Sequence, residues 1–199
     1  ATSVNFLSDL NKAVSIIGPE DLLLFINDNC FSASNTKAGY NSPKILGWRF
    51  HPNPKLPPRN IVRSRAMFKA HRYIAMSASL ATETAADAYF KHPNGAYTYA
   101  LLQTLEKGIT YMEWHQRTLA LLKKLGFKQT CTIEGPIELA NRKVFEGNVY
   151  CFYLSSHGTY TYDKDGDEGD GQDEGPYLFD RMVLDDEINA IIAKNKYLW

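Results

Sequence analysis

The spacing of apolar residues along the chain predicts helices that alternate with short buried strands. Residues 3–17 place Phe6, Leu10 and Val14 at helical intervals, which predicts an amphipathic helix. Residues 22–26 form a continuous apolar run of strand length, a pattern typical of a strand that is buried on both faces. The first two elements are therefore expected to be a helix and then a core strand.

The same patterns predict the remaining elements. Strands are expected at residues 73–77, 129–133 and 149–154, and helices at residues 84–90, 97–106, 110–125 and 185–194. The helix at 110–125 opens with a capping box, because Thr110 is followed three residues later by Glu113. Residues 33–70 form a long connection rich in proline, asparagine, glycine and basic residues. Strands alternating with helices favour an α/β fold with a largely parallel sheet.

Composition indicates one domain. The chain has 199 residues, of which 44% are apolar, enough for one core. No run of 18 apolar residues predicts a membrane span, and the first residues do not have the pattern of a signal peptide. Three cysteines are too few, and odd in number, for a disulfide scaffold. We therefore expect a protein of a reducing, cytoplasmic setting.

The net charge of zero hides one basic and one acidic segment. Residues 29–82 contain no acidic residue and nine lysines and arginines, whereas residues 163–187 contain eleven of the 22 acids. The basic segment could be a nucleic-acid surface or a solvated loop. Its five prolines and its lack of a binding motif favour the loop, so we do not expect a nucleic-acid partner.

Two reactive side chains follow predicted strands. Cys30 comes after the strand at 22–26, and His157 after the strand at 149–154. In a parallel sheet the carboxyl ends of the strands share one edge, so these residues are expected to lie near each other. A thiol beside an imidazole provides a nucleophile and its base. The alternative is that Cys30 is a small buried core residue.

Asp28 lies two residues before Cys30, on the same face if the backbone is extended. A carboxylate would raise the pKa of a neighbouring thiol, so it does not suit activation of the nucleophile. It fits better as part of a pocket for a cationic substrate group. A turn-forming role for Asp28 is the alternative.

The acidic segment nearly matches a calcium-binding loop. Within residues 163–174, carboxylates occupy the first, third, fifth and twelfth positions of an EF-hand pattern. The sixth position, which requires glycine, is Glu168, and the preceding element is a predicted strand, so an EF-hand is rejected. Binding of a hard cation such as Ca²⁺ and a solvated loop both remain open.

Several motifs together resemble the metacaspase family and cover most of the chain. Three segments resemble the large-subunit region of that family: Tyr153-Leu154-Ser155-Ser156-His157-Gly158-Thr159, residues 165–174 and Val183-Leu184-Asp185-Asp186-Glu187. Asp28-Asn29-Cys30-Phe31-Ser32 is similar to the family's nucleophile motif, Asp-x-Cys-x-Ser-Gly. Residues 77–79, 84–88, 95–101 and 122–130 resemble the small-subunit region.

The resemblance implies a caspase-like three-layer α/β/α fold with a largely parallel central sheet. A single peptidase domain over residues 1–199 would combine a nucleophile and small-subunit-like part (1–147) with a histidine and acidic-loop part (148–199). The implied activity is that of a calcium-regulated cysteine endopeptidase that cleaves after Arg or Lys and needs no organic cofactor. Its partners would be peptide or protein substrates, with no membrane partner, and we expect a monomer.

The resemblance also assigns roles to individual residues. Cys30 would be the nucleophile and His157 the general base and acid. The backbone N–H groups of Cys30 and Gly158 would form the oxyanion hole. The family's other site residues match Asp28 and Ser155 in the basic-residue pocket and Asp173, Asp185 and Asp186 as calcium ligands.

The chain departs from the family in order and in detail. Cys30 precedes His157, whereas metacaspases have the histidine first, so either a circular permutation or joined fragments would explain the order. Ser156 and Ala33 stand where the family has glycine, and its opening strand is not visible. The alternative function is therefore a catalytically inactive caspase-like protein that binds calcium or a partner. If the protein is active, we expect a self-cleavage or inhibitory site within residues 34–70.

Overall fold

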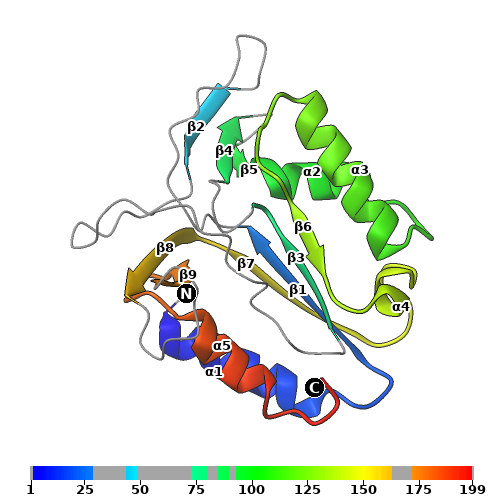
Figure 1. Ribbon diagram of the computed structural model, residues 1–199, viewed down its shortest axis with the longest axis vertical. Helices are drawn as coiled ribbons and strands as arrows, with labels where there is room; N and C mark the ends of the chain where they lie inside the picture. Colours follow the sequence, from blue (N-terminus) through cyan, green and yellow to red (C-terminus); the bar gives the residue numbers. More distant parts are fainter. Residues whose placement is uncertain are drawn as a thin grey trace.

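A four-stranded, mostly parallel sheet forms the centre of the computed structural model, which describes residues 2–28, 44–48, 73–79, 85–89, 93–162 and 172–198. Its strand order is β6 (Thr132–Glu134), β3 (Tyr73–Ser77), β1 (Leu22–Asp28) and β7 (Val149–Ser155). Strand β1 runs parallel to β3 and to β7, and β6 pairs antiparallel with β3 (Figure 1). The expected α/β class and largely parallel sheet are confirmed.

Strand β1 lies between two hydrophobic clusters, and all seven of its residues are buried. Leu24 and Ile26 belong to one cluster, whereas Leu23 and Phe25 belong to the other. Because successive side chains of a strand point to opposite faces, both faces of the sheet at β1 are covered. This explains the unbroken apolar run in the sequence.

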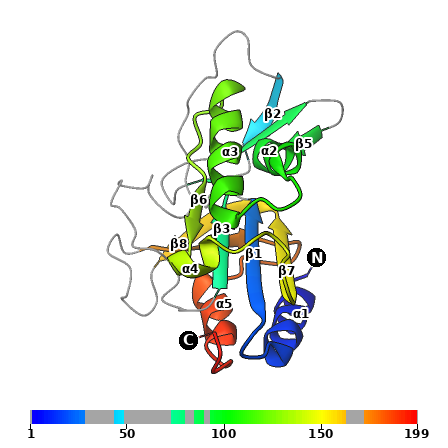
Figure 2. The ribbon, with the colours of Figure 1, turned by 90° about the vertical axis from the view of Figure 1, so that its right-hand side faces the viewer.

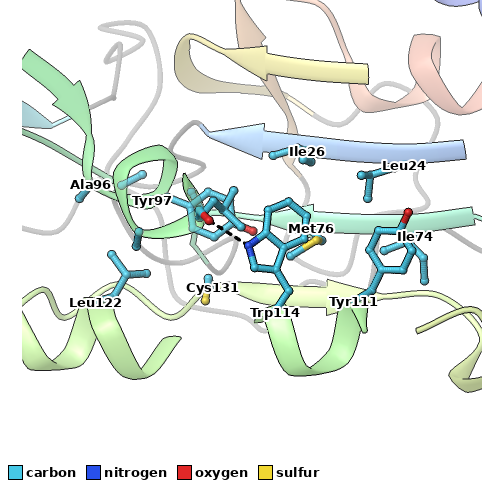
Figure 3. Close-up of a cluster of buried hydrophobic side chains, with 14 of the residues drawn as sticks. Leu24, Ile26, Ile74, Met76, Ala96, Tyr97, Tyr111, Trp114, Leu122 and Cys131 are labelled. Carbon is cyan, nitrogen blue, oxygen red and sulfur yellow. Dashed lines mark hydrogen bonds between the residues drawn. The ribbon is translucent and has the colours of Figure 1, made fainter. Parts of the chain in front are cut away.

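Helices α2 (Ala96–Thr104) and α3 (Tyr111–Lys124) cover one face of the sheet. Figure 3 shows Tyr97, Tyr111 and Trp114 packed against strand side chains that include Leu24, Ile26, Ile74 and Met76. The indole Nε1 of Trp114 donates a hydrogen bond to the Leu101 carbonyl at 2.9 Å, which ties α3 to α2. The predicted capping box of α3 is confirmed by both of its hydrogen bonds.

Helices α1 (Ser3–Ile16) and α5 (Asp185–Ile192) lie side by side on the opposite face (Figures 1 and 2). The C-terminal part of the chain holds both ends of α1. Asp180 accepts hydrogen bonds from Ser3 N at 2.7 Å and Ser3 Oγ at 2.6 Å. The buried Asn195 amide donates to the carbonyls of Val14 at 2.5 Å and Ile17 at 3.0 Å. These bonds satisfy backbone groups that a helix end leaves open.

The helix predicted at residues 84–90 is wrong, because this segment contains strand β4 (Ala86–Tyr89). Strand β4 pairs antiparallel with β2 (Lys44–Trp48) and with β5 (Pro93–Gly95) in a separate three-stranded sheet. The alanines of this segment have a high intrinsic helix propensity. The hydrogen bonds that β4 makes with a partner strand on each side outweigh that preference. Strand β2 also shows that residues 33–70 are not entirely irregular.

Two further features were not predicted from the sequence. Strands β8 (His157–Tyr162) and β9 (Gln172–Tyr177) pair as an antiparallel ribbon, and a short helix, α4, spans Ile137–Ala140. The strand predicted at 129–133 is present but shorter and shifted, as β6. Among the helices of the described ranges, none is long and apolar enough for a membrane crossing.

Candidate active site

The carboxyl ends of β1 and β7 lie next to each other at one edge of the main sheet. The two strands are parallel and paired along their whole length, with Ile26 beside Tyr153 and Asp28 beside Ser155. Neighbouring strands are about 4.8 Å apart, so Asp28 and Ser155 share one face at close range. The expectation that these two strands belong to one sheet and end at one edge is confirmed.

The two predicted catalytic residues follow these strand ends at the same offset. His157 comes two residues after Ser155 and Cys30 two residues after Asp28, but Cys30 lies outside the described residues. Only Ser156 separates β7 from β8, so His157 stands where the chain leaves one sheet and enters another. The His157 side chain is exposed, as a group that meets a substrate must be.

Gly158, which is predicted to contribute to the oxyanion hole, is buried in strand β8. Ser155, predicted to line the pocket, is exposed at the end of β7. These two residues and His157 therefore lie within one short stretch that joins the two sheets. Their predicted roles remain predictions.

Asp28 is completely buried, with 0% of its surface exposed. Its Oδ2 accepts hydrogen bonds from Thr98 N at 3.2 Å and from Thr98 Oγ1. Thr98 is the third residue of α2. The N-cap residue of this helix is Gly95, which makes no side-chain capping hydrogen bond. Asp28 thus caps α2 from a neighbouring strand, and its negative charge suits the positive end of the helix dipole.

Thr98 and Tyr153 extend this interaction toward the surface and were missed by the sequence analysis. Thr98 Oγ1 lies 2.6 Å from the hydroxyl of Tyr153, a residue with 47% of its surface exposed. Below them Tyr97 is fully buried, and burial raises the pKa of its hydroxyl well above the ordinary value, with Cys131 and then Asp28 adding smaller contributions. A buried carboxylate is thereby linked to an exposed phenol through one threonine.

The described residues include a cysteine–histidine pair that was not predicted from the sequence and is not suited to attack a peptide. Cys131 Sγ lies 3.9 Å from His115 Nδ1 on α3. Cys131 is only 2% exposed, so a peptide carbonyl cannot reach its sulfur without unfolding of the core. Burial also lowers the pKa of His115, which disfavours the charged imidazolium that would pair with a thiolate. This pair belongs to the core.

The predicted calcium ligands are placed by their backbones alone. Asp173 lies in β9, and Asp185 and Asp186 begin α5, while their side chains and residues 163–171 lie outside the described part. In the described part, no three or more histidine, cysteine or acidic residues are grouped as metal ligands. Oxygen donors of this kind fit Ca²⁺ chemically, and the calcium site stays a prediction.

Comparison with known proteins adds no assignment. A scan against protein-family models and a search of curated proteins both found no match to this chain. The function is therefore argued from the placement of its own residues.

Proposed function

We propose that this protein is a metacaspase-like cysteine endopeptidase that cleaves peptide bonds after Arg or Lys with Cys30 and His157. One observation carries the proposal: β1 and β7 are adjacent and parallel, with Asp28 paired to Ser155. In the proposed site, residues 30 and 157, each two positions beyond that pair, meet at this edge of the sheet. A thiol and an imidazole at neighbouring strand ends suit nucleophilic catalysis.

In the proposed reaction, His157 takes the proton of the Cys30 thiol, and the thiolate attacks the carbonyl carbon of the scissile bond. Backbone N–H groups of Cys30 and Gly158 stabilise the negative charge on the carbonyl oxygen. The C–N bond then breaks, and His157 returns the proton to the leaving amine. Water activated by His157 hydrolyses the acyl-enzyme and restores the free thiol.

The proposed fold is the caspase-like three-layer α/β/α arrangement. It is supported by the two hydrophobic clusters on opposite faces of the sheet, one with α2 and α3 and the other with α1 and α5. Calcium would be held by Asp173, Asp185 and Asp186 and would regulate the enzyme by screening their charges. No chemical step is assigned to the ion.

A fluorogenic peptide assay tests the proposal. Wild-type protein, with and without calcium, should release the fluorophore from an arginine peptide, and Cys30→Ala and His157→Ala should abolish this release. Cys151→Ala is a matched control, because Cys151 is an exposed thiol on β7 away from the strand end. If Cys30→Ala keeps wild-type activity, the assignment is wrong. If wild type binds the peptide without cleaving it, the protein is the inactive alternative.

A further inference from the structure

The interaction among Asp28, Thr98 and Tyr153 has a fixed direction. A threonine hydroxyl has one hydrogen, and in this structure Thr98 donates it to the Asp28 carboxylate. The bond between Thr98 Oγ1 and the Tyr153 hydroxyl, 2.6 Å long, must therefore take its hydrogen from Tyr153. The outward side of the Tyr153 oxygen is left with lone pairs only.

This direction determines which ligand groups Tyr153 can bind. An oxygen that has already donated its hydrogen can only accept, so a ligand must offer N–H or O–H donors. Hydrogen bonds in a chain polarise one another, and here the chain ends on a buried carboxylate, which makes the exposed oxygen a stronger acceptor. A cationic donor such as guanidinium or ammonium gains the most from such an acceptor.

The position of Tyr153 suits the side chain that precedes a scissile bond. Tyr153, Ser155 and Asp28 lie on the same face of the sheet, because Asp28 pairs with Ser155 and alternate residues share a face. Tyr153 lies two residues before Ser155, a distance of about 7 Å along the strand, comparable with an extended arginine side chain. Asp28 is fully buried, whereas Tyr153 is exposed, so Tyr153 is the accessible end of the chain.

We propose that Tyr153 determines specificity by accepting a hydrogen bond from the basic side chain of the substrate, and that Thr98 is a positioning residue that links Tyr153 to the Asp28 carboxylate. This inference rests on the proposed endopeptidase function and names the group that reads the basic residue. Asp28 acts on the substrate through the hydrogen bonds that connect it to Thr98 and Tyr153, rather than by direct contact. No proton is transferred along the chain in this role.

Kinetics with paired substrates test the inference. The substrates are peptides that differ only in arginine or citrulline before the scissile bond, since citrulline keeps the shape and lacks the charge. Tyr153→Phe and Thr98→Val should raise KM for the arginine peptide about tenfold or more, the loss expected for a hydrogen bond to a charged group. The kcat value and the citrulline KM should hardly change. Thr98→Ser, which keeps the hydroxyl, should restore the wild-type KM.

A control and a binding measurement separate this inference from the proposed function. Tyr150→Phe, on the opposite face of β7, should leave both substrates unaffected. Equal effects of Tyr153→Phe on arginine and citrulline peptides, or no effect, would overturn the inference while the protease assignment stands. If wild type cleaves nothing, calorimetry with the same peptides decides. Tighter arginine binding lost in Tyr153→Phe supports the inference without catalysis, and equal binding or none overturns it.

Discussion

Replacement of Asp28 tests how strongly this buried carboxylate holds α2. In Asp28→Ala, the amide and the hydroxyl of Thr98 both lose their acceptor. Loss of the cap bond costs about 1 kcal/mol, and loss of the charged acceptor of the hydroxyl costs about 2 kcal/mol. We expect the unfolding free energy to fall by about 3 kcal/mol, which for a chain of this size lowers Tm by about 6–12 °C.

Asp28→Asn should be milder, because its amide oxygen can still accept both hydrogen bonds, although the charge is lost and an NH2 group replaces the second oxygen. Its expected cost is about 1 kcal/mol, the difference between a charged and a neutral acceptor. Urea unfolding followed by circular dichroism measures both variants. Asp9→Ala is a suitable control, since Asp9 is an exposed residue of α1 that pairs with Lys12, and a change within about 0.5 kcal/mol is expected.

The order of stabilities decides between two roles for Asp28. If Asp28→Ala unfolds at the same urea concentration as wild type, the carboxylate does not hold the helix. If the variant is more stable than wild type, the buried charge costs more in desolvation than its hydrogen bonds return, as expected for a carboxylate kept for function. Either result would refute the calculation above.

Two other properties can be checked with the same unfolding assay. Asn195→Ala removes two hydrogen bonds to the C-terminal end of α1 and should lower the unfolding free energy by about 2–3 kcal/mol; an unchanged urea midpoint would contradict this. Burial lowers the pKa of His115 from the ordinary 6.5. As the pH decreases below about 6.5, the unfolded chain therefore takes up a proton on His115 more readily than the folded chain does, and the free energy of unfolding decreases. His115→Gln should flatten this slope, and an unchanged slope would exclude His115 as its source.

The sequence was informative where local pattern and tertiary environment agree. The unbroken apolar run of β1 is explained by burial on both faces, and the α3 capping box forms from residues three apart. The helix predicted at residues 84–90 is wrong because the alanines there favour a helix locally, while β2, one of the two partners of β4, comes from a distant part of the chain. Strand pairing with remote segments leaves little signal in a single local window.

The candidate site also contains one residue that the sequence could have predicted and one that it could not. Tyr153 could have been identified, since it lies two residues before Ser155 and must share its face in a strand. Thr98 could not, because its contact with Asp28 depends on how the start of α2 meets the end of β1. Spacing along a strand determines a face, whereas the approach of a helix is set by packing in three dimensions.

The order of Cys30 and His157 in the chain does not by itself argue against a shared site. Parallel strands end at the same edge wherever they occur in the sequence, so the pairing register matters and the order does not. Strand β7 lies more than 100 residues after β1, yet Asp28 pairs with Ser155. A slip of one residue would turn one of these side chains to the other face and break their alignment. The equal offsets of Cys30 and His157 from this pair are therefore the geometric basis of the proposed site.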